Sequence, residues 1–398
     1  MKKSIALVSI VLALVLLAGC TLGDKNWGNK GGSELGDAVK NEQDGINDPM
    51  GNEENPEDGG ESDNISSGEN SDIMDDNGVD ISPGDEKLRI KDYFPFTENT
   101  RYVYEGTGNE FASYNVFNDF IEENRVQQRI NNGGTETLKV LELKEDELVC
   151  VFTKPETYYR ENLMKAKGKD EEILLMAPLK EGTSWTLKDS RTRKITGTSV
   201  EVTTPAGSYK GIEVMTDGPN GKNFDYYVKG IGLVKSVFTD GESEISSSLS
   251  KIETNASLVQ EINFYYPGAE LDKIYYETKD VSFKTNDITR WVLEKAYKEM
   301  LNSKLSKVFS KNTKINSLYL NKDGMVYIDL NKAFIEEMNA GAAYEAMILQ
   351  SVANTFGEYF KAKKVILTID NELYESGHIS FKKWEYIETN LKDTVEIK

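Results

Sequence analysis

The sequence predicts a multidomain α+β protein, in which an antiparallel curved β-sheet domain is followed by a β-α-β-β-α-β two-layer α/β sandwich. Short segments rich in Tyr, Val, Ile and Thr, separated by turn residues, fill residues 87–253 and predict the sheet. Two helical periodicities alternate with strands in residues 258–388 and predict the sandwich. The chain has 398 residues, which is room for both domains.

Residues 1–19 are typical of a secretory leader. Lys2 and Lys3 precede an apolar run that ends at Leu17, and this run is shorter than the roughly 20 residues that a spanning helix needs. A basic start, a short apolar segment and small residues at a cleavage point describe a signal peptide. The stretch Leu17-Ala-Gly-Cys20 resembles the lipobox of bacterial lipoproteins. The resemblance implies cleavage before Cys20 and a diacylglyceryl group on its sulfur.

Residues 20–86 are predicted to be a disordered acidic tether. Residues 21–86 contain 19 Asp and Glu against 3 Lys, which accounts for most of the formal charge of -20. So polar a segment cannot bury enough surface to offset the entropy of ordering it. A more specific reading is that its acidic clusters bind Ca²⁺ or a basic partner, but the spaced ligands of an EF-hand are not reproduced. The folded remainder lacks a basic stripe, which argues against nucleic acid binding.

The region 87–253 alternates strands and turns. Segments rich in β-branched and aromatic residues are expected to be strands. Examples are Arg101–Tyr104, Arg125–Ile130, Thr137–Leu143, Leu148–Thr153, Val200–Thr204 and Leu233–Phe238. Cys150 lies in one of these strands and has no partner for a disulfide, so we expect a small buried side chain. The phrases Tyr93-Phe-Pro-Phe96 and Gly182-Thr-Ser-Trp185 resemble curved-sheet domains of exported lipoproteins. Such sheets sometimes hold a lipid, although aromatic residues also fill sheet cores without any ligand.

The region 258–388 begins with a strand at Glu261–Tyr266 and a second extended piece. Asn286 and Asp287 are expected to cap a helix whose apolar face is given by five residues: Ile288, Trp291, Val292, Ala296 and Met300. A hairpin with its turn at Asn321–Gly324 follows. A second helix over about Tyr344–Tyr359 and an unbroken apolar strand at Val365–Ile369 complete the pattern.

Several of these phrases resemble the GerM-type (GerMN) domain of sporulation and spore-germination lipoproteins. They are Phe264-Tyr-Tyr-Pro267, Glu299-Met-Leu301, Val326-Tyr-Ile-Asp-Leu-Asn331, Val352-Ala-Asn-Thr-Phe356 and the strand Val365–Asp370. Two positions depart from the family: Asp370-Asn371 replaces a glycine turn, and Asn302-Ser-Lys304 replaces a Gly-Pro. The family is similar to ring-building motifs that associate side by side in envelope complexes, so the resemblance implies an interaction role.

The sequence offers little for catalysis, and we expect no enzyme, no cofactor and no metal site. A catalytic triad would have to use the single histidine, His378, which lies in a polar stretch after the last strand. His and Cys are too few for a zinc site. Asp329 alternates with apolar residues in its strand and is expected to cap a neighbouring loop rather than to act as an acid or base.

Two functions remain open. In the first, the chain is a lipoprotein on the outer face of the cell membrane. Its C-terminal domain assembles with itself or with envelope proteins in sporulation or spore germination. In the second, the curved sheet carries or senses a lipid or another apolar ligand. We prefer the first, because the more specific resemblance lies in the C-terminal region.

The lipid anchor makes a direct prediction. The substitution Cys20→Ser should release the mature chain from the sedimented membrane fraction into the supernatant. Each buried CH₂ of an acyl chain contributes about 0.8 kcal/mol, and one chain alone anchors only marginally. Immunoblots of both fractions from cells that express either form would measure the distribution. Equal sedimentation of the two forms would contradict the anchor.

Overall fold

The computed structural model describes residues 88–169, 171–270 and 273–397. The expected leader, the lipidated Cys20 and the acidic segment 20–86 lie outside the described residues. Described residues from Leu88 onward belong to one compact unit, and the predicted class, a curved antiparallel sheet followed by an α/β region, is confirmed.

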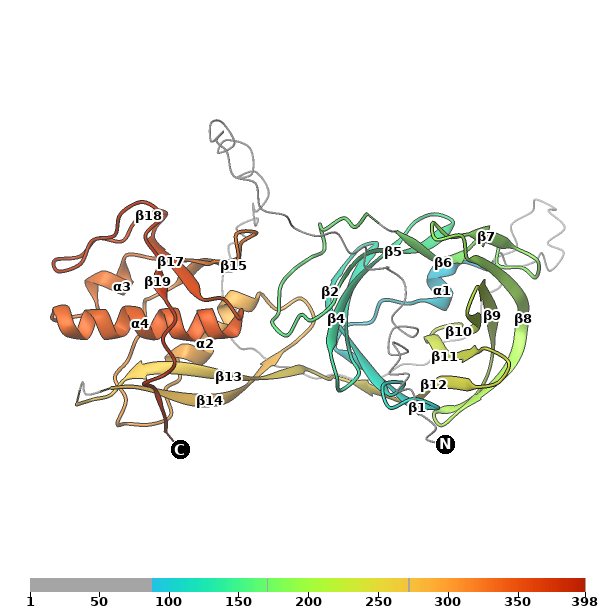
Figure 1. Cartoon of the computed structure of the whole chain (residues 1–398), viewed down its shortest axis with the longest axis horizontal. Helices are drawn as coiled ribbons and strands as arrows, with labels where there is room; N and C mark the ends of the chain where they lie inside the picture. Colours follow the sequence, from blue (N-terminus) through green and yellow to red (C-terminus); the bar gives the residue numbers. More distant parts are fainter. Residues whose placement is uncertain (1–87, 170, 271–272, 398) are drawn as a thin grey trace, which may run out of the picture. The chain divides into compact units, whose positions relative to one another are not determined.

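The first part of this unit is one antiparallel sheet of 12 strands (Figure 1). Its strands, in chain order, are β1 (Thr100–Thr107), β2 (Tyr114–Glu122), β3 (Arg125–Asn131), β4 (Glu136–Leu143), β5 (Glu147–Lys154), β6 (Glu172–Met176), β7 (Ser184–Thr186), β8 (Thr192–Thr204), β9 (Gly207–Gly218), β10 (Gly221–Val228), β11 (Gly232–Thr239) and β12 (Glu244–Thr254). All six expected strands are present. Their order across the sheet is 6-5-4-3-2-1-12-11-10-9-8-7, so β6 and β7 form its edges.

Side chains bring these two edges together. Trp185 of β7 donates its indole N–H to the carbonyl of Ile173 on β6 at 3.0 Å. Arg193 of the neighbouring β8 donates to the same carbonyl at 2.6 Å and pairs with Glu172 of β6 at 2.5 Å. The backbone groups of an edge strand are unpaired, which favours aggregation. The side chains of Trp185 and Arg193 give one such group, the carbonyl of Ile173, its hydrogen-bond partners. The sheet is therefore nearly closed.

The interior of the curved sheet is filled by the chain itself. The short helix α1 (Ile90–Tyr93) packs there against residues from β3 to β10, among them Trp185 and Tyr227. Phe94 and Phe96 pack against the same cluster. A second cluster, built around Tyr102 and Tyr104 of β1, fills a further part of the interior. Aromatic side chains thus serve as core in the described part of the sheet.

The second part contains two smaller sheets. Its elements are β13 (Leu258–Pro267), β14 (Ile274–Phe283), α2 (Thr289–Lys298), β15 (Ile315–Leu320), β16 (Val326–Leu330), α3 (Ala333–Glu336), α4 (Ala342–Tyr359), β17 (Lys364–Ile369), β18 (Glu372–Leu373), β19 (Ile387–Glu388) and β20 (Val395–Glu396). One sheet has the order β13-β14-β20 and the other β15-β16-β17-β18, with β19 also paired to β17.

Helix α4 is the centre of this second part, with β13 and β14 on one side and β17 on the other (Figure 1). Every residue from Ser351 to Gly357 is buried, which is the pattern of a helix packed on all sides. At Gly357 an added Cβ would lie 2.1 Å from Thr389, so only glycine fits there. Within the described residues no helix is both long and apolar enough to span a bilayer.

Two details of α2 were predicted wrongly. The helix begins at Thr289, and its N-cap residue, Ile288, makes no side-chain cap bond. Asn286 has φ +67 and accepts a hydrogen bond from the backbone N–H of Ile121, while Asp287 accepts from the N–H of Lys284. Both side chains therefore stabilise the turn before the helix instead of capping the helix. Asn286 faces the first sheet, because the N–H of Ile121 at the end of β2 needs an acceptor. Trp291, expected in the apolar face, is 55% exposed.

Arg160 joins the two parts. It lies in the loop after β5 and is almost completely buried. Its guanidinium donates to the carbonyl of Asp287, to the Thr289 hydroxyl at 3.0 Å and to the carbonyl of Lys284 at 3.1 Å. It also donates to the carbonyl of Asp119 on β2 at 2.8 Å. Burial lowers the pKa of this guanidinium, and the charge of Asp119 opposes that effect.

We expect Arg160→Ala to lower the free energy of unfolding by about 3 kcal/mol, because buried carbonyls would lose their donor. Urea unfolding followed by tryptophan fluorescence would measure the loss. The control is Arg191→Ala, which removes a partly exposed arginine paired with Asp189 and should change stability by less than about 1 kcal/mol. If Arg160→Ala were as stable as the control, other contacts would hold the junction.

Candidate functional site

The residues singled out by sequence do not come together in the described part of the chain. Cys150 is buried in β5, with its sulfur 3.6 Å from the carbonyl oxygen of Phe152, as expected for a small core residue. His378 is exposed, and its backbone N–H donates to the Ser376 hydroxyl at 3.1 Å. Cys20, the one expected modification site, lies outside the described residues. Among the residues described, His, Cys, Asp and Glu form no group of three suited to a metal ion.

Asp329 caps a loop, as its strand pattern predicts. It is 2% exposed in β16, and one carboxylate oxygen accepts from the Thr368 hydroxyl at 2.5 Å and from the N–H of Asn371 at 2.7 Å. The other oxygen accepts from the Asn316 amide at 2.8 Å. Asp370 and Asn371 both have positive φ, 48° and 65°, which Asp and Asn tolerate in a tight turn. The turn that departs from the family pattern is therefore held by Asp329.

The same side of this sheet carries an exposed aromatic surface, which we call the tyrosine face. It consists of Tyr319, Tyr327, Lys364, Leu373 and Tyr386, which surround the buried Ile366. In the register, Tyr319 pairs with Tyr327, and Tyr327 pairs with Ile366. Side chains alternate along a strand, and Val326, Ile328 and Leu330 point into the core. Tyr327 and its neighbours in the register must point outward.

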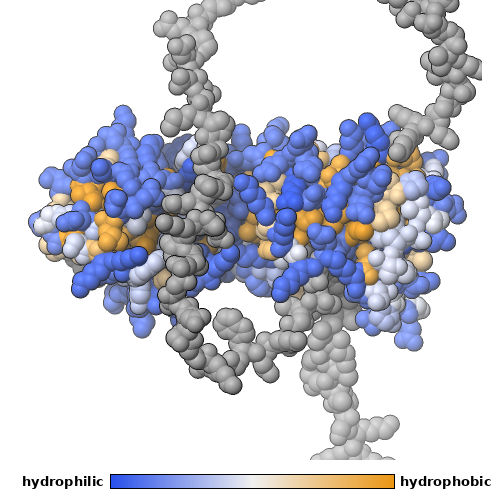
Figure 2. Space-filling model, turned by 90° about the horizontal axis from the view of Figure 1, so that it is seen from above, coloured by the Kyte–Doolittle hydropathy of each residue, from blue (hydrophilic) through white to orange (hydrophobic). Residues whose placement is uncertain are grey.

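The tyrosine face is ordered by ring contacts. The rings of Tyr319 and Tyr327 stack at 5.5 Å with an interplanar angle of 12°. The ammonium group of Lys364 lies 4.1 Å from the centre of the Tyr386 ring, a favourable cation–π distance. Tyr319 is 47% exposed and Leu373 is 49% exposed. In Figure 2, hydrophobic residues (orange) surface among hydrophilic ones at the left end, where Figure 1 labels α3, α4, β17 and β18.

Asp323 borders the tyrosine face and adjusts its polarity. The Tyr327 hydroxyl donates to the Asp323 carboxylate at 2.9 Å. Burial, followed by this hydrogen bond, raises the pKa of Tyr327. Burial and then the charge of Asp323 also raise the pKa of Tyr319. Both phenols therefore stay neutral at physiological pH, and the face offers uncharged rings to whatever contacts it.

One edge of the same sheet is open. Among the described strands, β15 pairs only with β16. The backbone N–H of Ile315, at the start of β15, donates to Glu294 of α2 at 2.8 Å, which protects that end. The rest of the strand presents backbone groups that another strand could pair with. The tyrosine face and this free edge meet at Tyr319.

Sequence reasoning missed this surface, although the signal for it was present. The turn at Asn321–Gly324 fixes the hairpin register, and that register places Tyr319 opposite Tyr327. Two tyrosines opposite each other on the non-core side of a hairpin predict an exposed aromatic pair. The contribution of Tyr386 could not be predicted, because β19 returns to β17 only in the folded chain.

Comparison with known proteins identifies a Germane domain in the C-terminal region. Residues 263–375 match the Germane family model, which is described as sporulation and spore germination. This confirms the family resemblance expected from the sequence for that region. No curated protein matches the chain.

Solved structures with similar regions have low sequence identity. A candidate lipoprotein from Clostridium perfringens is 21% identical over 33% of this chain and 87% of that one, with a TM-score of 0.22. The tandem GerMN domains of the sporulation protein GerM from Bacillus subtilis are 20% identical over 35% of this chain and 45% of that one, with a TM-score of 0.23. A candidate exported protein with a YmcC-like fold from Bacteroides fragilis is 13% identical over 40% of this chain and 98% of that one, with a TM-score of 0.26.

We expect Asp329→Ala to lower the free energy of unfolding by about 1–3 kcal/mol, because buried donors at Thr368 and Asn371 would lose their acceptor. The substitution Asp280→Ala, at an exposed position on β14, is the control and should stay within about 0.5 kcal/mol of the parent. Urea unfolding measures both. An Asp329→Ala variant as stable as the control would mean that the turn is held without this carboxylate.

Proposed function

Because residues 263–375 form a Germane domain, we propose that this chain is a membrane-anchored assembly protein of the cell envelope that acts in sporulation or spore germination. The single observation that carries the proposal is the tyrosine face beside the free edge of β15. The proposed partner is a second copy of the chain, which would add its own β15 strand to this edge.

The geometry supports pairing of two copies through β15. An antiparallel pair of identical strands is self-complementary, as a two-fold interface requires. The backbone groups of β15 would provide affinity through strand addition. Tyr319, the last residue but one of β15, would lie within such a contact, and tyrosine is enriched among the residues that contribute most to the energy of interfaces. The neutral phenols of the tyrosine face can be buried without the cost of removing a charge from water.

Membrane attachment through Cys20 belongs to the same proposal. The described residues begin beyond the acidic segment, so the anchor is supported by the Leu17-Ala-Gly-Cys20 motif alone. Two acyl chains would concentrate the protein at a surface, and high local concentration favours weak self-association.

Nothing in the described interior of the large sheet favours the alternative function of carrying an apolar ligand. The space inside the curve contains α1, Phe94 and Phe96, which pack against the surrounding strands. A lipid at this position would have to displace these side chains. The assembly function is therefore the one that the described residues support better.

Sedimentation velocity over rising concentration tests the proposal. The sample is the chain from residue 20 onward carrying Cys20→Ser, since a shorter C-terminal fragment would lose the contacts of Arg160. We expect the sedimentation coefficient to rise with concentration, and Tyr319→Asp to reduce the association constant at least tenfold, because a charge would be buried in the contact.

The matched control is Trp291→Asp, which adds the same charge at an aromatic residue that is 55% exposed outside the tyrosine face. It should associate like the parent. A strict monomer at all concentrations would overturn self-assembly, and lipid that co-purifies with the chain would then support the alternative.

A further inference from the structure

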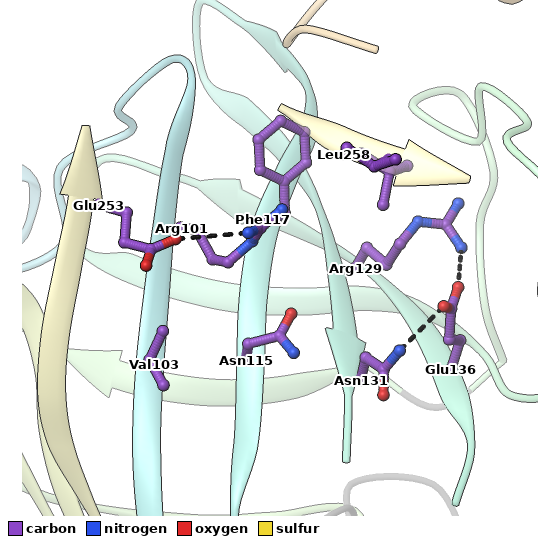
Figure 3. A pocket seen from close by; sticks show the side chains of 10 residues that line it. Arg101, Val103, Asn115, Phe117, Arg129, Asn131, Glu136, Glu253 and Leu258 are labelled. Carbon is purple, nitrogen blue, oxygen red and sulfur yellow. Dashed lines mark hydrogen bonds and ion pairs between the residues drawn. The ribbon is translucent and has the colours of Figure 1, made fainter. Parts of the chain in front are cut away.

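A polar pocket lies on the outer surface of the large sheet, where β13 crosses it (Figure 3). Its volume is about 370 Å³, which is within the range of small-molecule sites. Strands β1 to β4 and β12 provide polar side chains, and Leu258 and Val259 of β13 form one wall. The pocket is separate from the tyrosine face and plays no part in the proposed assembly.

One arginine of the pocket has no free donor. Arg129 is buried, and its guanidinium binds Asp119 at 3.0 Å, Glu136 at 2.6 Å and the carbonyls of Thr157 and Tyr159 at 2.8 and 2.9 Å. Burial alone would lower the pKa of Arg129, but the charges of Asp119 and Glu136 outweigh it and raise that pKa. A guanidinium has five N–H groups, and these partners accept hydrogen bonds from all three of its nitrogen atoms. Arg129 is therefore a structural element of the pocket wall.

A second arginine keeps free donors. Arg101 donates to the carbonyl of Ser257 at 2.5 Å and makes a single contact of 3.3 Å with Glu253. Its side chain is 30% exposed. Glu253 also accepts from Lys251 at 2.7 Å, so the Arg101 pair is one of two that this carboxylate makes. Three of the five N–H groups of Arg101 have no partner among the described residues.

Asn115 is the other group with unused hydrogen-bonding capacity. Its side chain lines the pocket, and among the described residues its amide has no hydrogen-bond partner. An amide offers both donors and an acceptor, which matches the N–H and C=O of a peptide bond. In the register Arg101 pairs with Phe117, and Val103 pairs with Asn115. Arg101 and Asn115 are thus diagonal neighbours on one face, about 7–8 Å apart at the backbone.

From these groups we propose that the pocket binds the carboxyl end of a short peptide. The carboxylate would accept from the guanidinium of Arg101, a charge-assisted pairing that arginine geometry favours. The preceding peptide bond would pair with the amide of Asn115. The distance suits this arrangement, since one residue spans about 3.8 Å and the long arginine arm covers the remainder.

The apolar part of the pocket suits a small terminal side chain. Val103, between the two polar groups, and Leu258 on β13 would contact it. The charges nearby balance: Arg101, Arg129 and Lys251 face Glu253, Glu136 and Asp119. A ligand carboxylate therefore meets no net negative field, and it competes with Glu253 and the Ser257 carbonyl for the donors of Arg101.

Calorimetric titration of the chain from residue 20 onward, carrying Cys20→Ser, with N-acetyl-Ala-Ala tests the proposal. We expect saturable binding by the parent, at least tenfold weaker binding of the peptide whose carboxyl is blocked as an amide, and at least fivefold weaker binding by Asn115→Ala. Parallel titrations with the L,L and D,D forms of the peptide distinguish two possible origins of the natural ligand. Preference for L,L indicates protein chain ends, and preference for D,D indicates peptides of the cell wall.

Two further variants keep the result interpretable. Arg101→Gln should weaken binding at least tenfold, whereas Arg191→Gln, a partly exposed ion-paired arginine elsewhere, should bind like the parent. Asn115→Ala removes no hydrogen bond within the described structure, so its thermal midpoint should match the parent. The proposal is overturned if the parent shows no saturable binding up to about 10 mM, if the blocked peptide binds equally well, or if a normally folded Asn115→Ala keeps full affinity.

Discussion

The bulge at Asp119 is the feature on which the rest of the structure depends. In the pairing of β2 with β3, Asn118 is opposite Gln128 and Phe120 is opposite Gln127, so Asp119 is an extra residue with no partner in the ladder. A bulged residue leaves its backbone groups free. Here the carbonyl of Asp119 accepts from Arg160 and from the N–H of Asn286 at 3.0 Å. Its buried carboxylate accepts from Arg129. One irregular residue thus receives bonds from the sheet, the loop and the second part of the chain.

The charges at this bulge explain why the contacts occur together. A carboxylate without any exposure is costly unless it is paired and hydrogen-bonded. Arg129 supplies the opposite charge and, through its remaining donors, holds the loop at Thr157 and Tyr159. That loop places Arg160 against the turn before α2, and the Tyr359 hydroxyl accepts the N–H of Arg160 at 2.9 Å. Removing any member would leave a buried polar group without a partner, so the arrangement is cooperative.

The sequence predicted those parts of the fold that depend on local patterns. The strands from Arg101 to Phe238, the hairpin at Asn321–Gly324 and the buried helix around Val352 follow from periodicity and turn chemistry. The role of Asp329 was also predicted, because the alternation of side chains along its strand places it on the face of the sheet that points away from the core. What could not be predicted depends on contacts between distant residues. Asn286 has the chemistry of a helix cap, but it serves Ile121, which lies 165 residues away, and no local pattern contains that requirement.

The candidate sites were hidden from sequence for the same reason. The pocket combines Arg101 and Asn115 with Leu258, and the tyrosine face combines two hairpin strands with Tyr386. Each of these two surfaces forms only when strands that are distant in the sequence come together in the folded chain. The interior of the large sheet, where the alternative function would place a ligand, is occupied by α1 and its neighbours. Aromatic residues of the chain itself fill the core of each part, whereas Arg101 and Asn115, which have unused hydrogen-bonding capacity, line a pocket on an outer surface. Both proposed contacts, through the tyrosine face and through the pocket, would therefore use the outside of the sheets rather than their interiors.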